Sequence, residues 1–314
     1  MATIKEIRDR INSVNDTRKI TSAMYLISST KLRRAKKLLD DTEPFFFSTK
    51  AMISRLVRHM PPEVENIFLE TRMDIPDEKK RRGYIIFTDD KGLAGAYNHN
   101  VIKLAEQHIF NDGLSWKLFV IGEVGRFHFL SKHMEMEETF MFTSQNPTLH
   151  RARKIAAEIL DYYYDRKIDE FFIIYTTVHG GVCETRYEKL LPLDIITDIQ
   201  QEKPLSGGVR EEFAMEPSPS AILDNIVPNY VTAYIYGALV ESFCAVQNSR
   251  MIAMDSANKN AAKMLEDLQR NYNRQRQAMI TQEITEVVSG AKALKRSKEA
   301  RRRAMEKAKQ EARQ

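Results

Sequence analysis

The stretch DDKGLAGAYN, residues 89–98, contains the residues whose types and spacing come nearest to a chemical function. Glycines between a strand and a helix let the backbone approach a phosphate group at the helix N-terminus. Gly92 and Gly95 nevertheless lack the third glycine of a dinucleotide-binding turn, and no acidic residue is plainly placed about twenty residues further on. We therefore interpret both glycines as parts of a tight strand-to-helix turn, and we keep nucleotide binding as the alternative.

Other catalytic and metal-binding motifs are missing from the sequence. Its seven histidines are scattered, and we find no HExxH motif, no cysteine–histidine cluster and no GxxxxGK[ST] loop. A Ser/His/Asp triad would lack its GxSxG elbow. Cys183 and Cys244 lie far apart in the sequence and are expected to be reduced thiols. The sequence therefore predicts no catalytic residue, no metal site and no cofactor.

Basic residues are concentrated at the C-terminal end of the chain. The 314 residues carry a net charge of +5, but the last twenty, KRSKEARRRAMEKAKQEARQ, hold nine basic and three acidic side chains. The rest of the chain sums to a charge of −1, so we expect no nucleic-acid partner. No apolar run approaches the roughly 18–20 residues that cross a bilayer, and the N-terminus shows neither a signal core nor a transit segment.

A long helix is predicted at each end of the chain. Apolar residues from Ile4 onward alternate at spacings of three and four, and this register continues to Leu39. Pro44 predicts a kink or a break, and the Pro61-Pro62 pair ends the first helical region.

The second helix follows EPSPS, with Pro219 in its first turn, where the missing backbone N–H has no cost. The only later proline before Leu294 is Pro228, so the helix is on the order of 110 Å long. Such a helix cannot be buried in a domain of this size. We therefore expect residues 216–294 to form an antiparallel coiled coil with residues 1–60.

Residues 61–215 have the alternating pattern of an α/β domain. Short apolar segments separated by helical patterns favour a Rossmann-like fold with a mostly parallel sheet, inserted between the two long helices. A tight turn at HGG joins the third strand to a further strand in CETRYEKLLPLDI, and residues 200–213 are expected to form a polar loop or edge hairpin. The other expected elements are strands at 83–90, 118–122 and 171–178 and helices at 96–110, 123–132 and 148–165.

Both ends of the chain resemble one protein family. IKEIRDRINSVNDTRKITSAMYLISSTKLRRAKK and YNRQRQAMITQEITEVVSGAKAL look like the two signature ends of the gamma subunit of F-type, proton-translocating ATP synthases. DDKGLAGAYN, EPSPSAILDNIVPNY, ALVES and RMIAMDSANKNA resemble its internal motifs. The resemblance implies a non-catalytic central-stalk rotor. Such a rotor couples ion flow through the membrane c ring to ATP synthesis or hydrolysis at the beta subunits, and it affects the regulation of the ATPase.

The resemblance assigns functional positions to four groups of residues on the long helices. They are a catch that hydrogen-bonds a loop of one beta subunit, an upper shaft, a coupling region near the acidic lever of the beta subunits, and a basic track facing that lever. The groups are Arg276 and Gln277 (catch), Thr281, Glu283, Glu286 and Val288 (upper shaft), Met24 and Arg250 (coupling region), and Lys31, Arg33 and Arg34 (basic track). Plain alternatives are helix packing for Met24 and a solvated pair for the catch.

The resemblance also implies partners and a location. The partners are the alpha and beta subunits of the head, the epsilon subunit and the c ring. The basic extension, residues 295–314, lies beyond the matching segments; it either reaches the delta subunit or is a solubilising extension without a role. Without a transit peptide, we expect a bacterial peripheral protein at the cytoplasmic face of the cell membrane.

The sequence departs from the family pattern at two internal motifs. The turn reads GLAGA, with Ala94 and Ala96 where the family usually reads GLCGG. Val246 replaces an acidic residue, which predicts the loss of a salt bridge there. Two other functions remain alternatives: a coiled-coil tethering protein that forms homodimers, and a nucleotide-binding α/β enzyme that uses Gly92 and Gly95.

Overall fold

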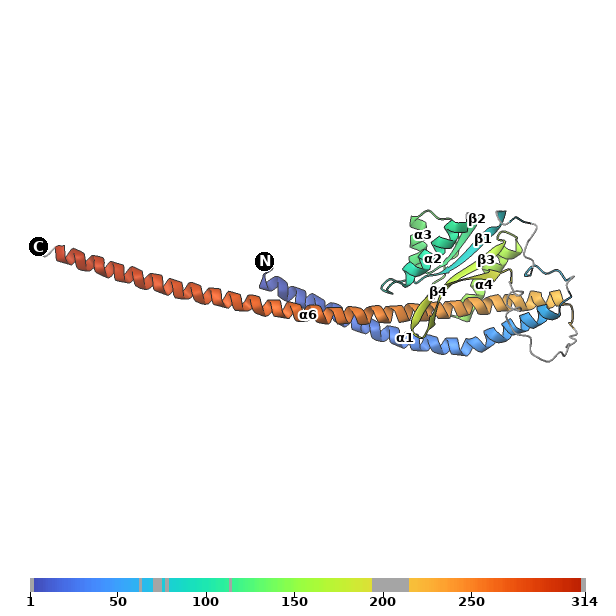
Figure 1. The fold of residues 1–314 in the computed structure, drawn as a ribbon, viewed down its shortest axis with the longest axis horizontal. Helices are drawn as coiled ribbons and strands as arrows, with labels where there is room; N and C mark the ends of the chain where they lie inside the picture. Colours follow the sequence, from blue (N-terminus) through green and yellow to red (C-terminus); the bar gives the residue numbers. More distant parts are fainter. Residues whose placement is uncertain are drawn as a thin grey trace. The chain divides into compact units, whose positions relative to one another are not determined.

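The structure is a computed structural model, and it describes residues 3–61, 64–69, 75–76, 79–112, 115–193 and 215–311. Its elements form two compact units. The shaft unit comprises Met1–Ala23 and Asp255–Gln314, and the α/β unit comprises Met24–Met254. In chain order the elements are α1 (Ile4–His59), β1 (Arg81–Phe87), α2 (Tyr97–Asp112), β2 (Ser115–Ile121), α3 (Glu123–Ser131), α4 (Leu149–Tyr164), β3 (Glu170–His179), β4 (Val182–Leu191) and α6 (Pro219–Glu311) (Figure 1).

A four-stranded sheet in the order β2-β1-β3-β4 forms the centre of the α/β unit. β1 pairs in parallel with β2 and with β3, whereas β4 runs antiparallel to β3. Gly180 and Gly181 make the turn between β3 and β4, with φ of 59° and 87°, which glycine adopts without strain. The expected mostly parallel sheet and the turn at HGG are confirmed. The expected loop at residues 200–213 lies outside the described residues.

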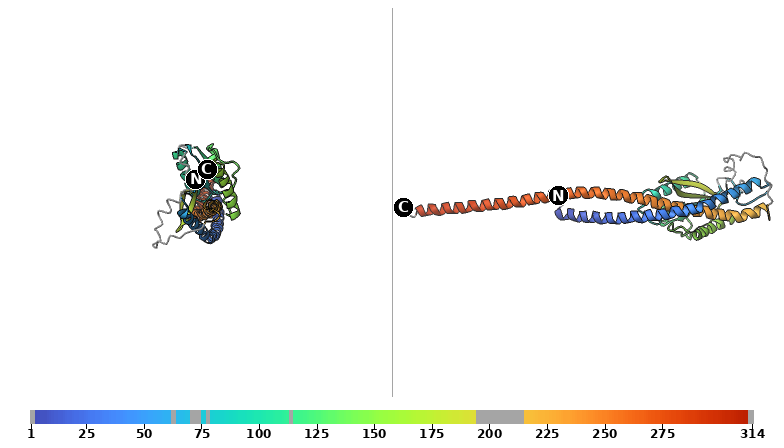
Figure 2. Two further views of the ribbon diagram at one scale, coloured as in Figure 1. Left: turned by 90° about the vertical axis from the view of Figure 1, so that its right-hand side faces the viewer. Right: turned by 90° about the horizontal axis from the view of Figure 1, so that it is seen from below.

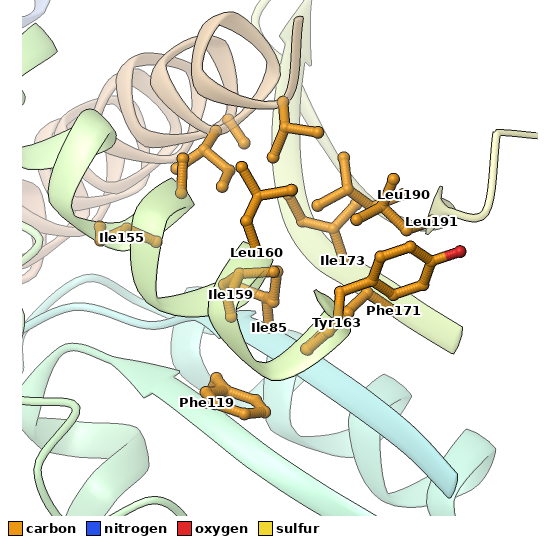
Figure 3. Packing of buried hydrophobic residues seen from close by; sticks show 14 of the residues in the cluster. Ile85, Phe119, Ile155, Ile159, Leu160, Tyr163, Phe171, Ile173, Leu190 and Leu191 are labelled. Carbon is orange, nitrogen blue, oxygen red and sulfur yellow. The ribbon is translucent and has the colours of Figure 1, made fainter. Parts of the chain in front are cut away.

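Hydrophobic layers cover both faces of the sheet. On one face, Ile85, Phe119 and Phe171 pack with Ile159 and Tyr163 of α4, and all five side chains are fully buried (Figure 3). Because successive residues of a strand point to opposite faces, their neighbours point to the other side. There they pack against α2 and α3. The two layers hold the carboxyl ends of β1 and β2 in fixed positions, and the candidate site begins at the end of β1.

Within the α/β unit, α1 and α6 pack along each other in opposite directions (Figure 2). The ring of Phe46 stacks on Tyr230, with centroids 5.6 Å apart. Leu32 and Ala35, which come earlier in α1, pack with Val240, which comes later in α6. The expected antiparallel pairing is therefore present in this unit, while coiled-coil geometry stays a prediction.

Hydrogen bonds join the same two helices within the shaft unit. Thr21 Oγ1 donates to Asn258 Oδ1, and Ser22 Oγ donates to the same oxygen at 3.3 Å.

At the start of α1, the Thr3 N–H donates to Glu6 Oε2 at 2.9 Å, and the Glu6 N–H donates back to Thr3 Oγ1 at 3.3 Å. This reciprocal pair is a capping box, which satisfies two backbone donors that the helix cannot satisfy itself.

Prolines affect the two long helices less than the sequence suggests. Pro44 lies inside α1, which continues to His59, so the expectation of a break at Pro44 is wrong. A proline removes one intrahelical hydrogen bond, and the packing of nearby Phe46 on α6 offsets that loss. The helix α6 begins at Pro219, as expected, and continues through the basic extension to Glu311. Within the described residues, no helix is both long enough and apolar enough to cross a membrane.

A carboxyl group is buried where α6 approaches the edge strand β4. Among the described residues, Glu241 Oε2 is a buried side-chain atom without a hydrogen-bond partner. Burial raises the pKa of Glu241 to about 7; Arg186 opposes this shift, and the carboxylates of Glu188 and Glu43 add to it. Glu188 in turn accepts a hydrogen bond from Tyr234 of α6. The packing of α6 on this edge therefore favours the neutral form of Glu241.

We predict that this carboxyl group makes the stability of the chain depend on pH. Its folded pKa lies above the ordinary value of 4.5, so the folded chain binds the extra proton. The stabilisation is complete below about pH 4.5 and is lost as the pH rises through about 7. Glu241→Gln, which keeps a neutral side chain, should therefore be more stable than the wild type at about pH 8. Urea denaturation at several pH values measures this difference.

The matched control is Glu184→Gln, which removes an exposed carboxyl group from β4. This variant should keep the wild-type decline in unfolding free energy between about pH 4.5 and 7. If Glu241→Gln shows the same decline as this control, the buried carboxyl group does not cause it.

Candidate functional site

The upper part of α6 is a continuous exposed surface. Every side chain of residues 276–302 is exposed, which includes the expected catch and upper shaft. Its side-chain hydrogen bonds are local, such as that from Thr281 Oγ1 to the carbonyl of Gln277 at 2.9 Å and that from Gln282 Nε2 to Glu286 Oε1 at 2.9 Å. Side chains that are exposed in this way are accessible to a partner.

This surface also carries an apolar stripe that the sequence analysis missed. Ile280, Ile284 and Val287 follow one another at spacings of four and three, so they lie on one face of the helix. All three are exposed, and Val287 is 72% exposed. Contiguous exposed apolar groups mark interaction surfaces. The signal was the helical spacing itself, which polar residues between the apolar positions obscure.

The expected basic track lies on the outer side of α1. Arg33 and Arg34 are exposed and Lys31 is half-buried, whereas the intervening Leu32 and the following Ala35 are buried against α6. Within the described part of the chain, neither arginine has an ion pair. The helix period therefore separates a buried apolar face from a cationic face, as it does in ordinary amphipathic helices.

Met24 is half-buried on α1, which fits helix packing. Two and three residues further on, Leu26 and Ile27 expose most of their large apolar side chains. Their neighbours Tyr25 and Ser28 belong to the heptad register. Leu26 and Ile27 do not. Their position outside the register was the signal in the sequence that Leu26 and Ile27 form an exposed apolar surface beside Met24.

Arg250 lies in the interior of the α/β unit rather than on an exposed face of α6. Its side chain is 9% exposed, and Nη2 donates to Asp89 Oδ2 and to the carbonyl of Gly92, the latter at 3.4 Å. The structure thereby joins two stretches that the sequence singled out separately, the turn at 89–98 and the segment around Arg250. Val246, where the sequence predicts the loss of a salt bridge, is buried in an apolar layer.

Asp89 stands at the centre of a network at the carboxyl end of β1. Its N–H donates to Asn98 Oδ1 at 2.9 Å, its Oδ1 accepts from Ser144 Oγ at 3.4 Å, and its carbonyl accepts from the N–H of Val124 at 3.1 Å. Burial raises the pKa of Asp89, and the Arg250 guanidinium opposes that rise. The network holds α2, α3, Ser144 and α6 around one aspartate: α2 and α3 bond its backbone, and Ser144 and Arg250 bond its carboxylate.

One glycine of this turn, Gly95, lies against α6, whereas a Cβ added at Gly92 would have no neighbour within 4 Å. Gly95 has a φ of 58°, and a Cβ added there would lie 3.8 Å from the carbonyl oxygen of Ser249 and 3.9 Å from Cβ of Ala253. The turn therefore lies directly against α6, as expected for a tight strand-to-helix turn rather than for a phosphate-binding loop. Within the described residues, no group of three or more His, Cys, Asp or Glu could hold a metal ion.

Comparison with known proteins identifies the family. A model of the ATP synthase family, matching residues 3–294, ends before the basic extension. A protein named ATP synthase gamma chain from Ruminiclostridium cellulolyticum is 41% identical over 292 residues, which are 93% of this chain and 98% of that protein. The ATP synthase gamma chain of Caldanaerobacter subterraneus subsp. tengcongensis is also 41% identical, over 91% of this chain and 98% of its own.

Solved structures share the fold at low sequence identity. A chain of the mitochondrial ATP synthase of Euglena gracilis, from a structure of its OSCP, F1 and c-ring, superposes with a TM-score of 0.64 at 14% identity, covering 93% of this chain and 94% of that chain. A chain from the central stalk and c-ring of the Tetrahymena thermophila enzyme gives a TM-score of 0.55 at 20% identity, covering 76% of this chain and 99% of that one. With a family match over residues 3–294 and identities of 41% over almost the full length of its relatives, this chain belongs to the ATP synthase gamma chain family.

Proposed function

We propose that this protein is the central-stalk rotor of an ATP synthase and that its long helices rotate inside the ring of alpha and beta subunits. The observation that carries the proposal is the identity of 41% to gamma chains over 93% of the chain. In this role it catalyses no reaction itself. It transmits rotation between the c ring and the nucleotide sites of the beta subunits, so that ion flow drives ATP synthesis and hydrolysis drives ion transport.

The exposed surface of residues 276–302 suits a shaft that must turn. A broad apolar interface would hold one orientation, because burial contributes about 25 cal/mol for each Å². The narrow stripe of Ile280, Ile284 and Val287 is interrupted by polar and charged side chains, whose exposed contacts contribute about 0–1 kcal/mol each. Contacts of that size form and break repeatedly at each orientation.

We assign the individual contacts from position and exposure. Arg276 and Gln277 are the catch for a beta-subunit loop, and both are exposed and able to donate hydrogen bonds. The next turns of α6 are the upper shaft. Arg33 and Arg34 face the acidic lever of the beta subunits, with Lys31 beside them. The residues of the upper shaft are Thr281, Glu283, Glu286 and Val288.

The proposed coupling region contains an exposed part and a buried part. Met24 belongs to the exposed part, together with the apolar Leu26 and Ile27. Arg250 belongs to the buried part, so its effect on coupling passes through Asp89 and the turn rather than through direct contact with a beta subunit.

The proposal extends to the domains, the remaining partners and the location. Residues 1–60 and 216–294 form the coiled coil, residues 61–215 form the Rossmann-like domain, and this domain contacts the epsilon subunit and the c ring. The protein lies at the cytoplasmic face of a bacterial cell membrane. One relative, from Acetobacterium woodii, is named as sodium ion specific. The proposed mechanism holds for protons and for sodium ions, because ions do not pass through this chain.

The test is reconstitution with the alpha and beta subunits of the same organism. The chain should form a complex with three alpha and three beta subunits that hydrolyses Mg-ATP. Arg276→Ala with Gln277→Ala should slow hydrolysis by about tenfold, because it removes hydrogen bonds that involve a charged donor. A steady-state ATPase assay of the purified complex measures the rate.

The control is the stability of the isolated chain. Both substituted side chains are exposed, so the unfolding free energy should change by less than about 0.5 kcal/mol. A chain that forms homodimers and no complex with the head subunits would favour the tethering alternative over the rotor.

The basic extension permits a second test. We propose that residues 295–314 contact the delta subunit by charge attraction. In support, α6 continues to Glu311, the cations among residues 295–302 are exposed, and the family match ends at residue 294. Truncation after Leu294 should weaken binding of the delta subunit by several-fold at low salt and have little effect at high salt. Equal binding by the full-length and truncated chains at low salt would contradict the contact and favour a solubilising role.

A further inference from the structure

Asp89 and Arg250 form a charge pair inside the α/β unit. When backbone and side chain are counted together, Asp89 is 2% exposed and Arg250 is 7% exposed. Removing two charges from water carries a large desolvation cost, which the attraction between them only partly offsets. Apolar residues of similar volume hold a core together equally well or better. The pair therefore adds little net stability, and what distinguishes it from an apolar contact is its geometry.

The apolar contacts of α6 beside the pair come from small side chains. Ala245 and Val246 pack in the layer beneath the sheet. Hydrophobic burial is non-directional, so small side chains on a smooth helix face permit small shifts along and around the helix axis. A guanidinium group behaves differently, because its donors lie in one plane with fixed directions.

Arg250 uses two of those directions. It donates to the Asp89 carboxylate at the end of β1 and to the carbonyl of Gly92 three residues further on. One acceptor is a side chain and the other is backbone of the same turn. A shift of α6 by a fraction of a helical turn would break both bonds and leave both charges buried and unpaired.

Asp89 itself cannot follow such a shift. Asn98, Ser144 and the N–H of Val124 hold its backbone and its second carboxylate oxygen. The next residue, Asp90, accepts from the N–H of Glu123 at the start of α3 at 3.3 Å. The acidic end of the pair is therefore fixed to three other segments of the α/β unit.

We propose that Asp89 and Arg250 are a positioning pair that sets the axial and rotational register of α6 on the α/β sheet, so that torque passes between the sheet domain and the shaft helix without slip. This inference rests on the proposed rotor function. It adds that α6 must be held in one position on the sheet for the rotor to transmit torque. Neither residue needs to contact a nucleotide or a beta subunit in this role.

The test compares Asp89→Asn with Asp165→Asn in the complete, membrane-reconstituted ATP synthase. Asp165 is the matched control, since it belongs to the same unit and its ion pair with Lys167 is exposed. The readout is ATP-driven ion pumping divided by ATP hydrolysis in the same preparation. Asp89→Asn should lower this ratio by about tenfold, within the range of interaction energies between residues of one network, and Asp165→Asn should keep the wild-type ratio.

A cross-link distinguishes positioning from a general loss of structure. The Cβ positions of residues 95 and 253 would lie 3.9 Å apart, which suits a disulfide. We would add Gly95→Cys and Ala253→Cys to Asp89→Asn, with Cys183→Ser to remove a thiol near Ser249. Oxidation should restore the ratio and reduction should lower it again. The bond joins two parts of the rotor, so it does not block rotation, and Gly95→Cys alone controls for the left-handed backbone.

The outcomes separate the two proposals. A coupled wild-type complex with an unchanged ratio in Asp89→Asn overturns the positioning pair and leaves the rotor intact. An oxidised cross-link that fails to restore coupling also overturns it, because the register would then not be what the pair provides. A wild-type complex that assembles without coupling overturns the rotor function and the inference together.

Discussion

The single helix α6 must be buried in the core along its early part and exposed along its later part. The rest of the structure depends on this constraint. The early part of α6 is a core element, where Leu223, Val231 and Val240 are fully buried. The side chains of its later part, residues 276–302, are exposed among the described residues. A single helix can do both only if its sequence changes from apolar on most faces to polar on most faces without a glycine or proline strong enough to end it.

The α/β unit is organised around the buried half of that helix. Both hydrophobic layers of the sheet include side chains of α6, so the sheet cannot be assembled fully without it. Among the polar groups buried in this interior are the Asp89–Arg250 pair and the Glu241 carboxyl group. The first is satisfied from several directions and the second is not. These two buried groups affect the protein differently. A network in which every polar atom has a hydrogen-bond partner specifies one geometry, whereas a buried polar atom without a partner lowers the stability of the fold.

Much of the fold follows from local sequence patterns. Apolar runs of strand length, the glycine pair at 180–181 and Pro219 placed the strands, the hairpin and the start of α6 within a few residues. Pro44 misled because the local cost of a proline is small beside the packing of a long helix on its neighbour. Asp89 was missed as a partner of Arg250 because the two lie 161 positions apart, and such a contact depends on how the whole unit folds. Exposure of the proposed catch and upper shaft could be expected from their composition, but the contacts proposed for them depend on chains that this sequence does not contain.

The apolar stripe on α6 has a consequence for the protein before assembly. Ile280, Ile284 and Val287 are exposed to water in this chain, and in the proposed rotor other subunits cover them. A newly made copy is therefore prone to self-association. The rate of self-association grows with the square of the concentration, because the first step requires two copies to collide. Synthesis of this chain in excess of its partners would yield aggregates and substrates for proteases rather than a useful reserve. Balanced production of the subunits is thus a requirement set by three side chains on one helix face.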